Sequence, residues 1–448
     1  MSGGNGRLER RINDSRGLND RVNFIVHRAV RVGVRVTDWS LLKFQRAPLR
    51  LNIIRGTMTV DRAWVRRNLK FDPIESPAPV ASFAFKAAAK KRAKLEDFQR
   101  EIIDFDSDGP EGRSFMTFSA ATGLSRFSEI PWPKGMEPKT DKKARTGAQG
   151  RLPEADVLVV TWTVDEGHAT SRVLTPGKDS RDDYASYTRN FKTISKKMTG
   201  RAPALQAGRL GAYWTTKING SRVVVFKSDS HLSQDTKKRP GPGQTLPNED
   251  VWRQIIEDVQ PKLVITTGTA GGIGSGCEVG DVVVSPIVTF DCEKWLKNEP
   301  FHNAEFDATE PKTKFLDEAL KLFKANEGQL PRDNVRPAQI LHTTGVSTGV
   351  TTTDFFGFDT SDDHFRLQGH GFVSEMGDAV LGLVIKRMKS EGKPTPRWLA
   401  VRNVSDPQIK AEGTIQEQAQ VAAQIYKGYG RWSTVSSAIV CWALIAAE

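Results

Sequence analysis

The sequence predicts an α/β fold, a sheet covered by helices on both faces, that follows a basic N-terminal extension. From residue 156 onward, short apolar runs of strand length alternate with stretches of helical spacing, which is the pattern of a sheet with helices packed on it. Before this alternation, residues 134–151 are polar, rich in Gly, Pro and Lys, and without periodicity. We expect them to be a linker, with residues 1–150 as the extension and residues 152–448 as the folded domain.

The individual elements follow from local patterns. Residues 86–105 are rich in strong helix formers and predict one helix, so the extension is expected to be partly disordered with at least one helix. Residues 1–57 mix Arg with Val, which fits an edge strand, a disordered arm or sequence upstream of the true start. The expected strands of the domain are 156–161, 222–226, 262–267, 281–288 and 397–405. The expected helices of the domain are 248–259, 379–389, 413–426 and 433–447.

The net charge of +12 is concentrated at the start of the chain. Residues 1–70 carry 16 Lys and Arg against 5 Asp and Glu, which accounts for +11 of that charge. The rest of the chain is close to neutral, so the basicity says little about the chemistry of the domain. One alternative for residues 1–70 is nucleic-acid binding through Arg contacts to phosphate, with the domain as effector.

The cysteines and the apolar runs predict a cytoplasmic protein. Cys277, Cys292 and Cys441 are too few and too scattered for a disulfide framework or a zinc site. The first residues lack the apolar core of a secretory signal, and residues 435–447 form an apolar run too short to span a bilayer. We therefore expect no membrane anchor.

The glycine-rich stretch LVITTGTAGGIGSG (residues 263–276) fits two classes of protein. Thr267 to Gly274 satisfies the TGxxxGIG pattern of short-chain dehydrogenases. Those enzymes carry a YxxxK pair downstream of the glycines, whereas the YxxxK of this chain, Tyr213 to Lys217, lies upstream. Directly after the glycines comes CEVGDVVVSPIV, for which a dehydrogenase has no use. The other class uses the glycine-rich segment as a turn that cradles a nucleoside.

The block GTAGG followed by VGDVVVS resembles the purine nucleoside phosphorylase and uridine phosphorylase superfamily. Two further blocks agree in order. VVTWTVDE (159–166) looks like the TALPxE or GAMEEE turn of the methylthioadenosine/S-adenosylhomocysteine nucleosidases. FVSEMGDAV (372–380) followed by WLAVRNVSDP (398–407) resembles that family's VEME…VVVRAISD. The resemblance covers about residues 155–448 and implies a three-layer α/β/α sandwich of the nucleoside phosphorylase type with a mixed central sheet.

The resemblance also implies catalytic residues. Breaking an N-glycosidic bond to a purine gives a ribose with oxocarbenium character and a base that leaves as an anion unless it is protonated. Asp406 matches the Asp that serves N7 of the purine, with Ser405 orienting it, although an Asp before Pro407 also suits a helix cap or turn. Glu166 matches the carboxylate that activates water, although an exposed loop Glu would look the same.

A larger set of residues matches positions that bind substrate in the family. These are Thr267, Gly268, Thr269, Ala270, Gly271, Phe355, Phe356, Glu375, Met376, Asp378 and Ser405. Either Phe could stack on the base or belong to the core. The chain departs from the family at Gly377, where the family has a Glu that holds ribose hydroxyls; Glu375 and Asp378 flank it and could substitute. Gly280 and Asp281 are expected to be structural turn residues.

The sequence therefore predicts a nucleosidase that hydrolyses a purine nucleoside or nucleotide. The GDPxR phosphate-binding signature of hexameric bacterial phosphorylases is absent from the first turn, which favours hydrolysis over phosphorolysis. This chemistry needs no cofactor or metal, and the main histidines (His168, His231, His364 and His370) are expected at the surface or in turns. The resemblance implies a homo-oligomer, a dimer or hexamer. The alternatives are a phosphorylase with a different phosphate site and a non-catalytic nucleoside-binding module.

Overall fold

The computed structural model describes two compact units of the chain. In the first unit, β1 (Leu51–Ile54) and β2 (Thr57–Val60) form an antiparallel pair. In the second, the described residues are 129–199, 202–232, 245–294, 296–331, 334–342, 345, 348–355, 364–406 and 414–448. The helix expected at 86–105 lies outside the described residues, as does most of the basic segment 1–70. The division of the chain at residues 150–152 stays a prediction.

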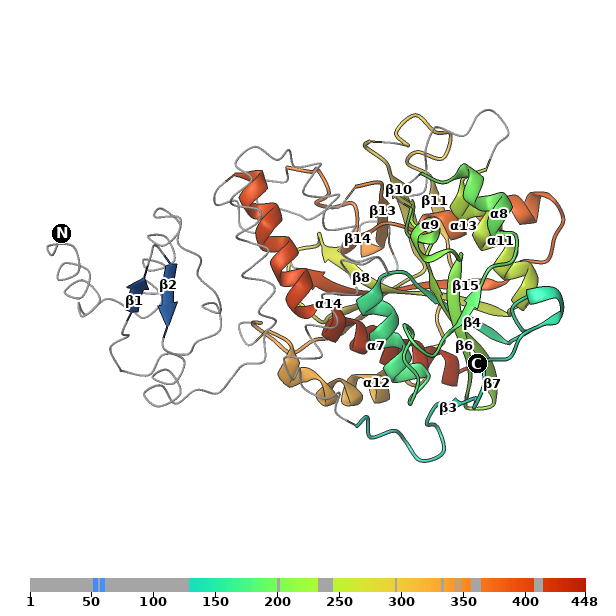
Figure 1. The fold of residues 1–448 in the computed structure, drawn as a ribbon, viewed down its shortest axis with the longest axis horizontal. Helices are drawn as coiled ribbons and strands as arrows, with labels where there is room; N and C mark the ends of the chain where they lie inside the picture. Colours follow the sequence, from blue (N-terminus) through green and yellow to red (C-terminus); the bar gives the residue numbers. More distant parts are fainter. Residues whose placement is uncertain are drawn as a thin grey trace, which may run out of the picture. The chain divides into compact units, whose positions relative to one another are not determined.

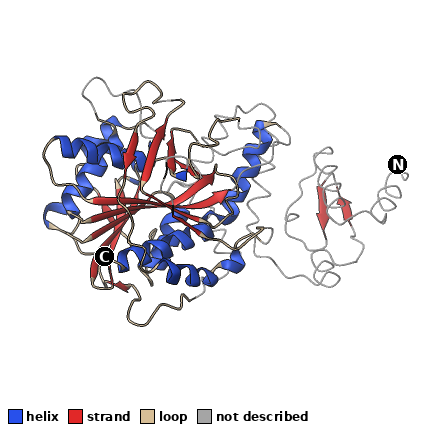
Figure 2. Ribbon diagram, turned by 180° about the vertical axis from the view of Figure 1, so that it is seen from behind, coloured by secondary structure: helices blue, strands red, loops and turns tan. Residues whose placement is uncertain are grey.

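Thirteen strands of the described residues form one mixed sheet with helices on both faces (Figures 1 and 2), which confirms the predicted three-layer α/β/α architecture. The order along its main path is β11-β10-β13-β14-β8-β4-β7-β6-β3, while β15 pairs with β8 and β9, β12 with β9, and β5 with β6. The strands are β3 (Lys139–Thr140), β4 (Val157–Thr161), β5 (Ala185–Tyr187), β6 (Gly211–Ile218), β7 (Ser221–Ser228), β8 (Leu263–Gly272), β9 (Val282–Ser285), β10 (Ile287–Asp291), β11 (Glu305–Asp307), β12 (Ile340–His342), β13 (Val350–Thr353), β14 (Val373–Glu375) and β15 (Arg397–Asp406).

Two hydrophobic cores hold the helices on the sheet, one on each face. The first packs beneath α8 (Phe191–Ile194), α9 (Pro203–Ala207), α11 (Pro247–Val259) and α13 (Asp378–Ser390). The second packs beneath α7 (Val164–Leu174), α12 (Leu316–Leu322) and α14 (Ile415–Ala446). Because successive strand residues point to opposite faces, β4 sends Leu158 and Val160 into the first core and Val157 and Val159 into the second. No helix of the described residues is long and apolar enough to cross a membrane.

The C-terminal region is one helix, α14, rather than the two helices expected at 413–426 and 433–447. Gly428 and Gly430 lie inside it, where their low helix propensity predicts a break. Packing overrides that local preference, because a Cβ on Gly430 would lie 3.4 Å from the Cγ2 atom of Thr269. That distance is an ordinary van der Waals contact, so α14 packs directly against β8 at this point.

Residues 134–151 are not the unstructured linker that their composition predicts. β3, within this segment, pairs antiparallel with β6. The Trp214 indole donates to the carbonyl of Asp141 at 2.9 Å, and the Trp442 indole donates to the carbonyl of Met136 at 2.7 Å. The segment therefore extends the edge of the sheet, and sequence-distant side chains satisfy its backbone.

The strand expected at 281–288 is divided at Pro286 into β9 and β10. Proline cannot donate to a strand ladder, and the Ser285 hydroxyl accepts from the Ile287 amide at 3.1 Å across the break. β9 pairs with β12 and β15, whereas β10 pairs with β11 and β13. The proline therefore marks the point where the chain passes from one set of partner strands to another.

Asp281 is the main polar anchor of the turn into β9. Its buried carboxylate accepts two hydrogen bonds from the Arg336 guanidinium, at 2.6 and 2.7 Å, and one each from the amides of Glu278 and Gln339. Gly280 has a φ of +97°, a conformation that favours glycine. These contacts support the structural roles expected for both residues.

Replacing Asp281 with Ala should lower the free energy of unfolding by about 1–3 kcal/mol or more, because the amides of Glu278 and Gln339 lose their acceptor, while the Arg336 guanidinium keeps only the carbonyls of Gly276 and Pro337. Chemical denaturation of the full chain measures this. Asp317→Ala, at an exposed position in the first turn of α12, is the matched control and should change the free energy by less than about 0.5 kcal/mol. Equal stability of the two variants would contradict the anchoring role.

Candidate active site

Most of the residues predicted to form a site lie where three parallel strands end. β8 pairs in parallel with β4 on one side and with β15 on the other, so their carboxyl ends lie at one edge of the sheet. Glu166 follows β4 on α7, Asp406 ends β15, and the glycine-rich segment ends β8. Open α/β sheets bind ligands at this kind of edge.

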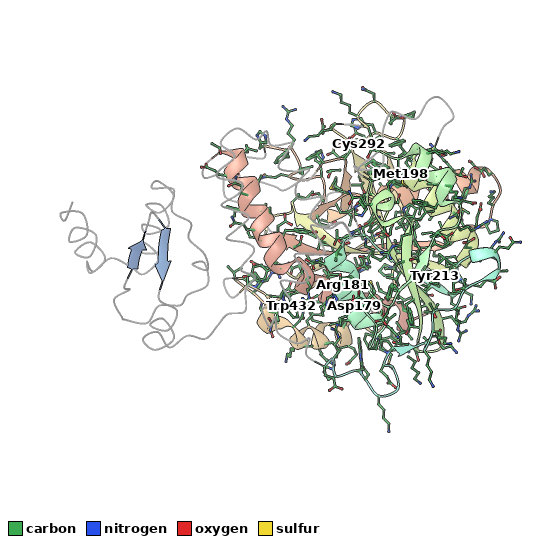
Figure 3. The ribbon with its side chains drawn as sticks, viewed as in Figure 1. Asp179, Arg181, Met198, Tyr213, Cys292 and Trp432 are labelled. Atoms are coloured by element: carbon green, nitrogen blue, oxygen red, sulfur yellow. The ribbon has the colours of Figure 1, made fainter. Side chains whose placement is uncertain are left out.

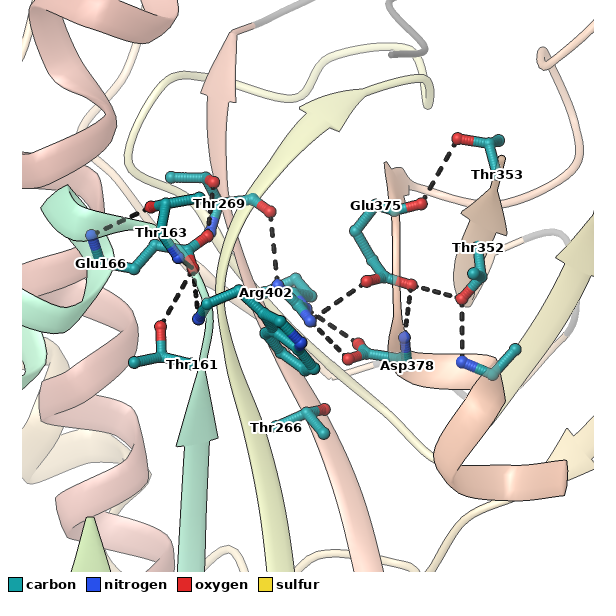
Figure 4. Close-up of polar contacts among 12 residues, drawn as sticks. Thr161, Thr163, Glu166, Thr266, Thr269, Thr352, Thr353, Glu375, Asp378 and Arg402 are labelled. Atoms are coloured by element: carbon teal, nitrogen blue, oxygen red, sulfur yellow. Dashed lines mark hydrogen bonds and ion pairs between the residues drawn. The ribbon is translucent and has the colours of Figure 1, made fainter. Parts of the chain in front are cut away.

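Glu166 is a buried carboxylate with five hydrogen-bond donors from the protein (Figure 4). Its Oε2 atom accepts from the Thr161 hydroxyl at 3.0 Å and from the amides of Trp162 and Thr163 at 2.9 Å. Its Oε1 atom accepts from the amide and hydroxyl of Thr269, at 2.7 and 2.6 Å. A carboxylate offers about four lone-pair sites, so the protein alone fills them.

The local sequence fixes Glu166 at the start of α7. The Thr163 hydroxyl caps the helix by accepting from the Glu166 amide at 3.2 Å, and the Glu166 carboxylate accepts in return from the Thr163 amide. This capping box is visible in the sequence as Thr followed by Glu three residues later. Burial alone would raise the pKa of Glu166, but the Arg402 charge and the Thr269 hydrogen bond outweigh it and lower the pKa. Glu166 is therefore ionised.

The glycine-rich segment is not a turn at Thr267 to Gly272; β8 continues as a strand to Gly272. Pairing with β15 on one side and β14 at the end keeps it extended, which local sequence does not reveal. Gly268 has a φ of +149°, and a Cβ there would lie 2.3 Å from the Oε1 atom of Glu166. The Glu166 carboxylate can therefore occupy this position only if residue 268 is a glycine.

Arg402 connects the candidate residues and was not singled out by the sequence analysis. Its guanidinium is buried, binds both carboxylate oxygens of Asp378, and lies 3.1 Å from the Oε2 atom of Glu375 (Figure 4). Its Nη1 atom is 3.5 Å from the Thr269 carbonyl. The motif WLAVRNVSDP contains this Arg, so a search for the partner of the buried acids could have found it.

Glu375 is bound on both of its oxygens. Its Oε1 atom accepts from the Thr352 hydroxyl and from the amide of Asp378 at 2.9 Å, and its Oε2 atom faces Arg402. Burial, together with the neighbouring charge of Asp378, raises the pKa of Glu375 to about 8, although Arg402 opposes the shift. Glu375 and Asp378, the two acids expected to substitute for a side chain at position 377, are thus both partners of Arg402.

Trp162 occupies the space beside Gly377. A Cβ on Gly377 would lie 3.3 Å from the Cζ2 atom of this indole, closer than ordinary contact. The same ring lies against the Arg402 guanidinium, with 4.7 Å between the ring centroid and Cζ. Its edge meets Trp252 of α11, with 6.0 Å between centroids. Trp162 is therefore fixed on three sides.

Asp406 is a buried acid with spare hydrogen-bonding capacity. Its Oδ1 atom accepts from the Ser405 hydroxyl at 2.7 Å, while Oδ2 has no partner within the part of the chain that the structure describes. Burial raises the pKa of Asp406 to about 7, and the Ser405 hydrogen bond opposes this only in part. The Ser405 hydroxyl is also 3.2 Å from the Ala270 carbonyl. Asp406 is therefore partly protonated at neutral pH.

The remaining predicted residues lie in different surroundings. Thr267 and Gly271 are part of β8, and Met376 is partly buried after β14. Phe355 is buried in a small apolar cluster and stacks on Phe365, with 5.6 Å between centroids, so it packs as a core residue. Phe356 lies outside the described residues.

One expectation about other side chains needs correction. His168, expected at the surface or in a turn, is buried on α7 with its Nδ1 atom 3.0 Å from Asp179, which is labelled in Figure 3. Burial, partly opposed by Asp179, lowers the pKa of His168 to about 4, so it is neutral.

Tyr213, also labelled in Figure 3, lies on the strand β6 together with Lys217. Four residues along a strand, at roughly 3.3 Å per residue, separate their backbones by about 13 Å. This spacing does not form the helical YxxxK pair of a dehydrogenase.

Comparisons with known proteins found solved structures that match at low sequence identity and low TM-score. No family model matches the sequence. The 5′-methylthioadenosine/S-adenosylhomocysteine nucleosidase of Neisseria meningitidis, solved with methylthio-immucillin-A, is 16% identical over 65% of this chain and 100% of its own, with a TM-score of 0.40. The nucleosidase of Colwellia psychrerythraea, solved with adenine, is 15% identical over 66% and 96%, with a TM-score of 0.37. The futalosine hydrolase of Helicobacter pylori is 11% identical over 64% and 96%, with a TM-score of 0.37.

Replacing Gly268 with Ala should displace Glu166, because the new Cβ would overlap its Oε1 atom. We expect about 1–3 kcal/mol of backbone strain and a further loss of about 1–3 kcal/mol from the broken hydrogen bonds, measured by denaturation. Gly276→Ala is the matched control, since Gly276 also has a positive φ, +80°, but open space around it. Equal effects would show that only strain matters.

The raised pKa of Asp406 should make stability depend on pH. Between the ordinary pKa of 3.8 and about 7, the folded protein holds a proton that the unfolded chain has released, so this contribution to stability falls as pH rises. Asp406→Asn is neutral in both states. Unfolding free energies of variant and wild type should diverge from pH 4 to pH 8 in favour of the variant, by up to about 4 kcal/mol. A constant difference would contradict the shift.

Proposed function

We propose that the domain predicted at residues 152–448 is a nucleosidase that hydrolyses the N-glycosidic bond of a purine nucleoside or nucleotide. The observation that carries the proposal is Asp406, a buried acid that is partly protonated at neutral pH and has one oxygen unengaged within the described residues. A purine leaves as an anion unless it gains a proton, and a general acid works best with a pKa near the working pH. Asp406 meets both requirements.

Glu166 supplies the second part of the mechanism. The sugar becomes positively charged as the bond breaks, and a fixed, ionised carboxylate in a buried site stabilises that charge. The C1′–N9 bond breaks with its electron pair going to the base, and Asp406 gives its proton to N7. A water oxygen bonds to C1′, its proton passes by way of Glu166 to solvent, and Asp406 regains a proton from solvent. Since Glu166 already has five donors, one of its bonds to Thr269 must yield when water binds.

The test is release of free purine by the full-length protein from a panel of purine nucleosides and nucleotides, with and without inorganic phosphate. Hydrolysis predicts free base and free sugar at a rate independent of phosphate. Formation of a sugar 1-phosphate only in the presence of phosphate would establish a phosphorylase instead. Binding without turnover of any compound would support a non-catalytic nucleoside-binding module.

Asp406→Asn should lower turnover by roughly 10²–10⁴, the usual contribution of a positioned acid, with little change in substrate affinity. Wild-type turnover should decline above about pH 7 as Asp406 loses its proton, and the variant should lack this decline. Asp307→Asn, at the exposed end of the edge strand β11, is the matched control and should retain wild-type turnover. Near-normal turnover by the Asp406 variant would show that this residue only shapes the turn.

A further inference from the structure

We infer that the site does not use a carboxylate to recognise the ribose hydroxyls, so that purine 2′-deoxynucleosides are cleaved at least as well as the corresponding ribonucleosides. This inference rests on the proposed function and names the substrate class of the same site. The inference is based on the contacts among Trp162, Gly377 and Arg402, which lie on the side of the site where we expect the sugar to bind.

The expected position of the sugar follows from the positions of Asp406 and Arg402 on β15. Asp406 and Arg402 are four residues apart on β15, about 10–13 Å at roughly 3.3 Å per residue, which is comparable to the length of a purine nucleoside. A base that receives a proton from Asp406 has its sugar on the side of Arg402. β14 runs antiparallel to β8, with Ser374 opposite Gly271, and therefore carries the chain through Met376 and Gly377 toward that same side.

The acids on this side already have partners within the protein. Both oxygens of Asp378 bind the Arg402 guanidinium, and the oxygens of Glu375 bind Thr352, the Asp378 amide and Arg402. Asp378 is fully buried and Glu375 is 5% exposed, so turning either carboxyl group toward a vicinal diol would weaken its contact with the buried Arg402 guanidinium, which is costly. We therefore expect both acids to keep their contacts with Arg402 when the sugar binds.

Position 377 carries no side chain, and the Trp162 ring crowds the space where one would begin. The Trp162 indole lies 3.3 Å from where a Cβ would be, and Arg402 and Trp252 hold that ring in place. The sugar therefore faces the glycine backbone and the Trp162 ring, and the carboxylate oxygen beside them, Oε2 of Glu375 at 3.7 Å from that Cβ position, is held by Arg402. Such a surface does not distinguish a CH₂ group from a CHOH group at C2′ by hydrogen bonding.

The stability of the transition state then favours cleavage of the deoxynucleoside. A 2′-hydroxyl withdraws electrons from C1′ and destabilises the oxocarbenium transition state. Enzymes that prefer hydroxylated sugars offset this with hydrogen bonds to the 2-hydroxyl that strengthen in the transition state. Without such a bond, the intrinsic reactivity of the deoxynucleoside is expressed in its rate.

The experiment measures kcat/KM of the full-length protein for adenosine and 2′-deoxyadenosine, or for the guanosine pair if guanine is the better base. A hydroxyl bound by a carboxylate is worth about tenfold or more. We expect the 2′-deoxynucleoside to equal or exceed the ribonucleoside. A preference of tenfold or more for the ribonucleoside would overturn the inference and leave the proposed function intact. The affinities of both nucleosides for Asp406→Asn, measured by calorimetry, test recognition of the hydroxyl without turnover, and binding of the ribonucleoside tenfold tighter or more would also overturn the inference.

Glu375→Gln and Asp378→Asn provide the second test. If these acids serve Arg402, each variant should lose activity on both sugars by the same factor, so the ratio should match that of wild type and of the Asp307→Asn control. A loss confined to the ribonucleoside would show that the substituted acid holds a hydroxyl. If neither nucleoside were cleaved or bound, the proposed function would fail together with this inference.

Discussion

The arrangement of the site depends on one buried negative charge, the carboxylate of Glu166. Burying an ion is costly unless hydrogen bonds replace its water, and here five donors from two segments do so. The first segment is the turn between β4 and α7, and the second is Thr269 on β8. These contacts constrain the chain at two places: Thr163 caps the start of the helix, and Gly268 must lack a side chain for the carboxylate to reach Thr269. The carboxylate thereby joins a turn to a strand that is distant in sequence.

The positive charge that balances this region is Arg402. It binds Asp378 and Glu375 directly, and its charge lowers the pKa of Glu166. A single guanidinium beside three buried acids cannot neutralise all of them, which agrees with the raised pKa of Glu375. The guanidinium also needs a rigid support. β15 provides it, because the strand is paired on both edges, with β8 and β9.

Much of the fold could be predicted from local patterns, and the errors arise where distant contacts outweigh local preference. The apolar runs of β4 and β7 and the helical spacing of α11 predict their elements correctly because each buries a face set by its own periodicity. Propensity fails for α14, where packing against β8 tolerates glycines inside the helix. Composition fails for residues 134–151, since the indoles of Trp214 and Trp442 accommodate a polar segment at the sheet edge.

Part of the candidate site could also be predicted, because two of its residues carry local sequence signals. The spacing of Thr163 and Glu166 is a local signal, and the end of a buried strand before Ser-Asp indicates where Asp406 lies. The function proposed for these residues is still a prediction. The contact of Trp162 with Gly377 joins two elements far apart in sequence, and no pattern in either segment indicates the other. The same holds for Arg402, whose partners lie on β8, β14 and α13.

The helix α14 has a further consequence for how the protein is made. The Asn403 amide, between Arg402 and Asp406 on β15, donates to the Ser433 hydroxyl at 2.7 Å and accepts from Ser437 at 2.8 Å. The strand β15, which carries Arg402 and Asp406, is thus held by hydrogen bonds to α14, a segment that is synthesised after it. Glu166, by contrast, leaves the ribosome early, and its partners on β8 and β15 follow only much later. Such long-range contacts form slowly because a large loop must close first. During translation, Glu166 and α7 can therefore complete their contacts only after β8, β15 and α14 have emerged.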